Sequence, residues 1–152
     1  MDPISYVNLS AQWHDEKEEL WPIIEAILED GHYVGGDAVA EFEGDVAQVC
    51  GTVHAVALNS GTDAIICALA ALNIGSGDEV ITMSNTAIPT VSSIISTGAN
   101  VKFVDIDRYY LLDVNKIKKC ISKKTKAIIP VHLYGQSCDM EKICKIAKKY
   151  KL

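Results

Sequence analysis

A strand–turn–helix pattern between residues 53 and 72 constrains the fold more than any other stretch of the chain. The apolar block Val53–Leu58 follows Gly51 and is typical of a strand that is buried on both faces. The block Ala64–Leu72 is rich in alanine and leucine and contains no helix breaker, so it predicts a packed helix. A buried strand joined to a helix by a short turn indicates an α/β protein.

The turn between these two blocks contains residue types that begin helices. The side chain of Ser60, Thr62 or Asp63 can accept a hydrogen bond from a first-turn N–H, and Gly61 allows a sharp turn and exposes backbone donors. Free N–H groups and the positive end of the helix dipole favour an anion such as a phosphate. An ordinary capped helix without a ligand explains the same residues, and so short a motif does not choose between the two readings.

From Val53 onward, strands and helices alternate. Strands are predicted at Glu79–Met83, Val101–Val104 and Ala127–Val131, and helices at Ile88–Thr97, Val114–Ser122 and Met140–Tyr150, the last with Ile143, Cys144, Ile146 and Ala147 facing inward. Strands separated by helices of this length indicate βαβ units, and so an α/β fold with a mainly parallel sheet flanked by helices. Ligands bind beyond the carboxyl ends of such strands. Four segments are expected at that edge: Ser60–Thr62, Ser84–Thr90, Asp105 and His132–Gly135.

The first 52 residues follow a different pattern. Apolar residues at helical spacing predict a helix between Trp13 and Leu28, and Pro22 suggests that this helix begins at the proline, because a first turn tolerates proline. A glycine-rich loop with a lone aromatic residue, Tyr33, leads to a second helix, Val39–Cys50, which we expect to end at Gly51. We therefore divide the chain into an N-terminal helical segment with a glycine-rich loop, 1–52, and an incomplete α/β domain, 53–152.

Composition excludes several classes of protein. A chain of 152 residues with 49% hydrophobic and 22% charged residues is globular, and a net charge of -6 argues against a nucleic-acid partner. No C-x-x-C spacing occurs, so reduced and mostly buried thiols are expected rather than disulfides or a metal site, at Cys50, Cys67, Cys120, Cys138 and Cys144. The start Met1–Pro3 is unlike a signal peptide, and no apolar segment is long enough to span a bilayer. We therefore expect a soluble, cytoplasmic protein without a membrane partner.

Longer motifs follow one another in an order that is typical of one known family. They are Gly31-His32-Tyr33-Val34-Gly35-Gly36 with Glu41-Phe42-Glu43, Asn59-Ser60-Gly61-Thr62-Asp63-Ala64, Gly77-Asp78-Glu79-Val80-Ile81, Gly98-Ala99 through Val104-Asp105-Ile106-Asp107, Thr125-Lys126-Ala127-Ile128, and Pro130-Val131-His132-Leu133-Tyr134-Gly135-Gln136 with Asp139-Met140. Over essentially its whole length the chain resembles the DegT/DnrJ/EryC1/StrS family of sugar aminotransferases, which depend on pyridoxal 5'-phosphate (PLP).

The resemblance implies the N-terminal part of the large PLP domain of a type I aminotransferase, in a protein that forms a homodimer. It implies that Ser60, Gly61 and Thr62 bind the cofactor phosphate and that the position of Ala87 faces the cofactor ring. It also makes three residues candidates for the substrate side of the site: Tyr33, His132 and Tyr134. The implied substrates are a nucleotide-linked keto-sugar and an amino-acid donor such as glutamate.

Two features depart from the family pattern. The family commonly carries an aromatic residue after the position of Thr86, where its ring stacks on the cofactor, but Ala87 has only a methyl group. The family's Schiff-base lysine and the acidic partner of the pyridine nitrogen lie beyond the segment that matches Asp139–Leu152. We therefore expect the intact protein to be a transaminase, and this chain alone, as a fragment or the product of a truncated gene, to be inactive with no catalytic residue of its own. The alternative is a non-catalytic domain that binds a phosphorylated ligand or serves as a subunit partner.

Overall fold

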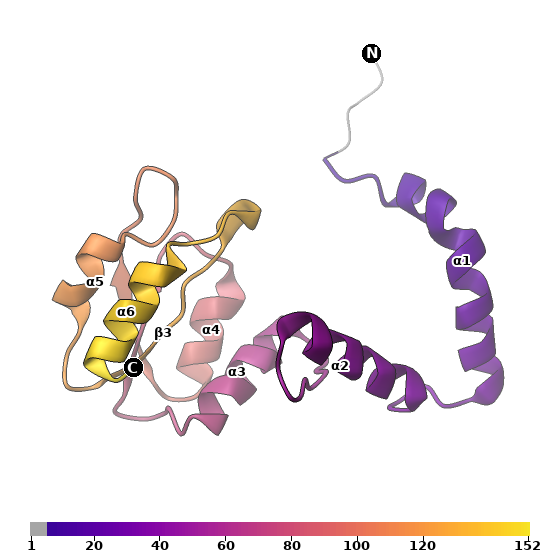
Figure 1. Cartoon of the computed structure of the whole chain (residues 1–152), viewed down its shortest axis with the longest axis horizontal. Helices are drawn as coiled ribbons and strands as arrows, with labels where there is room; N and C mark the ends of the chain where they lie inside the picture. Colours follow the sequence, from indigo (N-terminus) through magenta and orange to yellow (C-terminus); the bar gives the residue numbers. More distant parts are fainter. Residues whose placement is uncertain (1–5) are drawn as a thin grey trace, which may run out of the picture. The chain divides into compact units, whose positions relative to one another are not determined.

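The structure, a computed structural model, describes residues 6–152 and divides into two compact units (Figure 1). The first unit runs up to Ala57 and contains the helices α1 (Leu9–Asp30) and α2 (Asp37–Cys50). The second runs from Leu58 to Leu152 and contains the sheet. The start Met1–Pro3, on which the expectation of no signal peptide rests, lies outside the described residues.

Both helices of the first unit have identifiable ends. The Asn8 side chain caps α1 by accepting from the Ala11 N–H at 3.1 Å, and Gly31, at φ 76°, ends the helix in the left-handed conformation. The prediction that this helix begins at Pro22 is wrong, because the proline lies inside a helix whose N-cap lies further upstream. Gly51 ends α2 with φ 66°, as predicted.

The second unit alternates helices and strands. Its elements are α3 (Gly61–Ala71), β1 (Glu79–Met83), α4 (Ile88–Ser96), β2 (Asn100–Val104), α5 (Val114–Cys120), β3 (Thr125–Ile128), a 3-10 turn (Leu133–Gly135) and α6 (Met140–Tyr150). The strands pair in the order β2-β1-β3 and both pairings are parallel. The predicted α/β fold with a parallel sheet flanked by helices is therefore confirmed.

The central strand β1 is buried on both faces. Ile81 and Met83 belong to a core with α5 and α6, whose other buried members are Val104, Leu111, Leu112, Ile117, Cys138, Ile143 and Ile146. Val80 belongs to a second core with α3 and α4, whose other members are Leu69, Ile74, Ile94 and Ala99. Because alternate residues of a strand point to opposite faces, one short strand joins the two cores. The helices α5 and α6 therefore cover one face of the sheet, and α3 and α4 the other (Figure 1).

The segment Val53–Leu58 is not a strand, so the expectation of a buried strand here is wrong. Val53 is 86% exposed and Val56 is 76% exposed. A strand needs a neighbouring backbone to bond its N–H and C=O groups, and residues 6–152 provide none here. The Ala57 N–H instead donates to a Glu43 carboxylate oxygen at 2.7 Å.

The prediction that the cysteines are mostly buried is also wrong. All five thiols are free, as expected, but Cys50, Cys67 and Cys144 are exposed, and only Cys138 is fully buried. Cys144 was expected to face inward, whereas α6 presents Ile143 and Ile146 to the core. In residues 6–152, no helix combines the length and apolar character needed to cross a membrane.

The amino ends of β1 and β3 are joined by a polar cluster around Glu79. Its carboxylate accepts from the Ser122 hydroxyl at 2.5 Å and the Thr125 hydroxyl at 3.4 Å, and lies 3.8 Å from the Lys102 ammonium group. These contacts, the Ser122 hydrogen bond first among them, lower the pKa of the Glu79 carboxyl. The cluster lies at the edge of the sheet opposite the carboxyl ends of the strands, which suggests that it stabilises the fold.

Replacing Ser122 with alanine should raise the pKa of Glu79 toward its ordinary value, because the strongest donor to the carboxylate is lost. A carboxyl with a lowered folded-state pKa stabilises the fold above its unfolded pKa, and this contribution is lost as the pH falls through the folded value. The variant should therefore be less stable at neutral pH. The difference should be smaller in acid, where only the bond from the Lys124 N–H to the Ser122 hydroxyl is still lost. Carbon-13 NMR titration and pH-dependent unfolding measure both effects. An unchanged pKa of Glu79 in Ser122→Ala would contradict the prediction. The control is Ser96→Ala, which alters an exposed serine.

The burial of β1 predicts a second stability effect. Ile81 has no exposed surface, so Ile81→Val should lower the free energy of unfolding by about 0.5–1.5 kcal/mol. The same change at Ile95, which is 61% exposed, should alter it by less than about 0.5 kcal/mol. Urea unfolding of the two variants provides the comparison, and equal losses would show that β1 is not the centre of the core.

Candidate functional site

The first turn of α3 is held by its own N-cap residue. The Ser60 hydroxyl accepts from the Asp63 N–H at 3.1 Å and donates to the Asp63 carboxylate at 2.8 Å. The Ser60 carbonyl accepts from the Ala64 N–H at 3.0 Å, which is the first backbone bond of the helix. The Ser60 side chain is therefore engaged in capping α3.

Two backbone N–H donors at the start of α3 have no hydrogen-bond acceptor within residues 6–152. Within residues 6–152, no group accepts from the N–H of Gly61 or Thr62, and no hydrogen bond involves the Thr62 hydroxyl. Gly61 is helical rather than left-handed, so the expected sharp turn at this glycine is not found. A Cβ at Gly61 would meet only open space, so a ligand could approach these donors closely.

A buried hydroxyl ties the start of α3 to α4. Ser93 has no exposed surface, and its hydroxyl donates to the Thr62 carbonyl oxygen at 3.0 Å. This bond holds the backbone of the two free donors against a helix that begins at the carboxyl edge of the sheet. Sequence reasoning missed it, although a serine on the inward face of an apolar helix was a usable signal.

Beyond β1, the chain passes through Ala87 into α4. Ala87 is the N-cap of α4 and is exposed, and it provides no side-chain cap. Just before it, the Thr86 hydroxyl donates to the hydroxyl of buried Thr90 at 2.9 Å. Around Ala87 lies a hollow of about 370 Å³, lined mainly by Ser84, Thr86, Ile88, Val91, Ser92, Ile95 and Phe103.

The carboxylates that follow β2 serve local structure. Asp105 accepts from the Lys116 ammonium group at 2.9 Å and from the Ile106 N–H at 2.9 Å, and the Lys116 hydrogen bond is the main reason that the pKa of Asp105 is lowered. Asp107 accepts from the N–H groups of Tyr109 and Leu111. Both acids lie at the expected edge of the sheet, where they hold the loop before α5.

His132 and Tyr134 lie in the loop after β3. His132 Nδ1 accepts from the Cys138 N–H at 3.1 Å. Tyr134 has φ 58°, in the left-handed region, and its side chain is 83% exposed. Both residues therefore lie at the carboxyl edge, beyond β3, as predicted.

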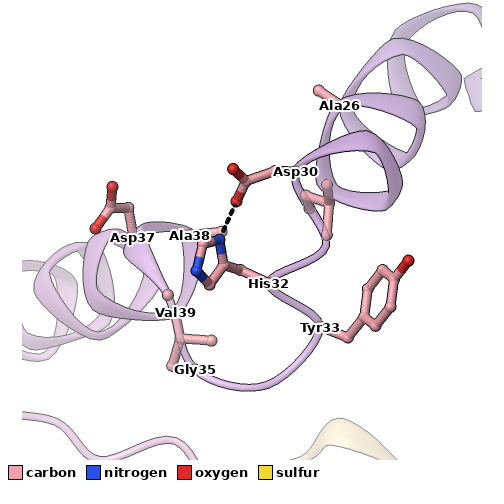
Figure 2. Close-up of a pocket in the computed structure, with 10 residues that line it drawn as sticks. Ala26, Asp30, His32, Tyr33, Gly35, Asp37, Ala38 and Val39 are labelled. Atoms are coloured by element: carbon pink, nitrogen blue, oxygen red, sulfur yellow. Dashed lines mark hydrogen bonds and ion pairs between the residues drawn. The ribbon is translucent and has the colours of Figure 1, made fainter.

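Tyr33 belongs to the first unit, where it lines a cavity of about 490 Å³ between α1 and α2. Its hydroxyl donates to the Leu28 carbonyl at 3.2 Å. Next to Tyr33, His32 Nδ1 lies 2.6 Å from a carboxylate oxygen of Asp30, the last residue of α1. Figure 2 shows the rings of His32 and Tyr33 extending to different sides of the loop. Sequence reasoning missed the Asp30–His32 pair, for which the spacing across Gly31 was the only signal.

The second unit thus brings most of the predicted site residues to related positions. The loops after β1, β2 and β3 meet at one edge because the strands are parallel, and Ser93 connects the α3 donors to the helix that follows β1. Among residues 6–152, no cluster of three histidine, cysteine or acidic side chains could hold a metal ion.

Comparison with known proteins matches this chain to one family. The model of the DegT/DnrJ/EryC1/StrS aminotransferase family matches residues 14–152. An Acidithiobacillus ferrooxidans protein named UDP-N-acetyl-3-dehydro-alpha-D-glucosamine 3-aminotransferase is 41% identical over 150 residues, which are 98% of this chain and 41% of the relative.

Two solved structures of other proteins match the structure of this chain over its whole length. DesV of Streptomyces venezuelae matches 100% of this chain and 41% of its own, with a TM-score of 0.96 and 35% identity. NtdA of Bacillus subtilis, solved with bound cofactor PMP, matches 100% of this chain and 35% of its own, with a TM-score of 0.95 and 32% identity. The chain spans about two-fifths of the length of the curated relatives that it matches. On both sequence and structure, it belongs to the DegT/DnrJ/EryC1/StrS aminotransferase family.

Proposed function

We propose that the protein to which these residues belong is a PLP-dependent aminotransferase acting on a nucleotide-linked keto-sugar, with an amino acid, glutamate being our candidate, as the donor. The observation that carries the proposal is the pair of free N–H donors at the start of α3, held at the carboxyl edge of a parallel sheet. Relatives named as nucleotide-sugar aminotransferases support the substrate class. A homodimer is the assembly that we propose for the intact protein.

The phosphate of the cofactor fits the start of α3. The N–H groups of Gly61 and Thr62 point out of the first turn of a helix, where the dipole favours negative charge. The Thr62 hydroxyl is available as a third donor, whereas the Ser60 hydroxyl is engaged with Asp63. We therefore assign phosphate binding to the backbone of Gly61 and to Thr62, with Ser60 fixing the turn.

The cofactor ring would lie near the start of α4, at Ala87. The Ala87 methyl group supplies dispersion contact without aromatic stacking, so this chain holds the ring less firmly at that position than an aromatic residue would. When bound, PLP supplies an electron sink for the reacting carbon of the amino-acid or sugar substrate. His132 and Tyr134, beyond β3, and Tyr33 in the first unit are our candidates for contacts on the substrate side.

The lysines of α5 and α6 are either paired with carboxylates or exposed. Lys116 pairs with Asp105, Lys142 with Asp139, and Lys145 with Glu141. The remaining lysines of α5 and α6 lie on exposed positions of those helices. We therefore propose that the lysine that binds the cofactor covalently is not among residues 6–152.

In the full-length protein, Thr62→Val should weaken PLP binding by about tenfold to a hundredfold. The variant loses a hydroxyl donor to a charged phosphate, a bond that contributes about 1.5–3 kcal/mol. Thr62→Ser should retain most of the affinity because it keeps the hydroxyl. Fluorescence titration with PLP measures the dissociation constants.

The matched control is Ser96→Ala, in an exposed serine near the end of α4. Ser93 is unsuitable as a control, because its hydroxyl holds the Thr62 carbonyl. Equal PLP affinity in the Thr62→Val, Ser96→Ala and unaltered proteins would show that Thr62 takes no part in phosphate binding.

The 152-residue chain alone should show no transamination. After incubation with PLP, an amino donor and a keto-sugar, borohydride reduction followed by peptide mass spectrometry should find no single lysine labelled in stoichiometric amount. Specific labelling of one lysine together with turnover would overturn the assignment. Retained PLP without labelling would favour the alternative of a non-catalytic domain that binds a phosphorylated ligand.

A further inference from the structure

The imidazole of His132 links the two ends of the loop between β3 and α6. His132 Nδ1 accepts from the Cys138 N–H at 3.1 Å, and the Cys138 thiol donates to the Val131 carbonyl at 3.2 Å. Cys138 is 4% exposed and belongs to the core beneath α5 and α6. One end of the loop is therefore anchored in the core, and His132 joins the other end to it.

Inside this loop the backbone takes an unfavourable conformation. Tyr134 has φ 58° and Gly135 has φ 79°, and a tyrosine in the left-handed region is rare. Two backbone hydrogen bonds close the turn. The Gly135 N–H donates to the His132 carbonyl at 3.1 Å, and the Gln136 N–H donates to the Leu133 carbonyl at 3.2 Å. Such a conformation persists only where surrounding contacts fix it, and it is concentrated at functional sites.

The hydrogen bond also fixes the state of the imidazole. A nitrogen that accepts from a backbone N–H carries no proton, so the neutral His132 ring carries its proton on Nε2. Within residues 6–152, His132 Nδ1 is the acceptor that satisfies the N–H of buried Cys138. Removing it would leave a buried donor unpaired, which is costly.

We propose that His132 is a positioning residue that acts through Tyr134. Its Nδ1 closes the loop His132–Cys138 and thereby holds the exposed Tyr134 ring at the carboxyl edge of the sheet, where Tyr134 contacts the sugar substrate. The contact made by Tyr134 rests on the proposed function, whereas the closing of the loop by Nδ1 does not. In this assignment, Nε2 of His132 has no direct role in proton transfer.

Three substitutions at His132 separate the two ring nitrogens. Asparagine places its carbonyl oxygen close to the position of Nδ1, glutamine places an acceptor close to the position of Nε2, and alanine has neither. In the full-length protein, amide hydrogen exchange at Cys138 should be slow in the unaltered protein and in His132→Asn. It should be about tenfold faster in His132→Gln and His132→Ala.

The amide of Ile129, which donates to the Ile81 carbonyl at 2.8 Å inside the sheet, reports whether each variant is folded. Its protection should be the same in all four proteins. Unchanged Cys138 exchange in a folded His132→Ala variant would overturn the role in closing the loop. Nitrogen-15 NMR of the imidazole should find Nδ1 unprotonated and Nε2 protonated, and the opposite tautomer would also overturn it.

Kinetics of the full-length enzyme test the role of Tyr134. His132→Ala and His132→Gln should raise KM for the keto-sugar more than they lower kcat, and His132→Asn should restore KM. Tyr134→Gly suits the left-handed backbone but removes the ring, so it should keep the Cys138 amide protected while raising KM. A His132→Asn enzyme as impaired in kcat as His132→Ala would assign the imidazole to catalysis instead. An unchanged KM in Tyr134→Gly would remove Tyr134 from the substrate site while leaving the role of His132 in the loop intact.

Discussion

The whole second unit depends on a strand whose last four residues have no exposed surface. Residues Val80 to Met83 of β1 are fully buried, so each face of this strand must be covered by helices and each edge by another strand. Parallel strands meet that requirement only through helical crossovers, which place α3 and α4 on one face and α5 and α6 on the other. The same crossovers bring every strand-to-helix loop to one edge. Burial of β1 therefore explains both the core and the position of the proposed site.

Local patterns were sufficient for two elements of the second unit whose neighbours lie within the chain. The bounds of β1 and α6 were predicted correctly, because apolar runs, helical spacing and glycine turns are all local signals. Val53–Leu58 has an equally strong apolar pattern but is exposed and unpaired. A strand forms only when its backbone is hydrogen-bonded to a second strand. A sequence pattern indicates the tendency to form a strand but does not show whether a second strand is present. The prediction that α1 begins at Pro22 also failed. The Asn8 cap and the surrounding helical hydrogen bonds stabilise α1 more than the missing N–H of Pro22 destabilises it.

The candidate site was predictable in its location more than in its contacts. Parallel topology alone places Ala87, Asp105 and His132 at one edge. Sequence did not indicate which donors are free, because this depends on which groups the cap has already engaged. Ser60 looks like a ligand residue in the sequence but is engaged with Asp63, whereas the N–H groups of Gly61 and Thr62 become available. The Ser93 bond to the Thr62 carbonyl could be identified only once α3 and α4 were seen to pack together.

The proposed anion site lies in a chain with a net charge of -6, which raises an electrostatic problem that local pairing addresses. The acid in the same helical turn as the free donors, Asp63, accepts from Ser60, and the acid after β2, Asp105, is paired with Lys116 at 2.9 Å. These contacts keep both carboxylates in defined positions, where a hydroxyl or an ammonium group offsets their charge. The donors assigned to the phosphate are themselves neutral, so most of the attraction comes from the dipole of α3 and from hydrogen bonding. Three neutral donors are few for a phosphate dianion, and we therefore expect the rest of the protein to contribute further donors or a positive charge to the same phosphate.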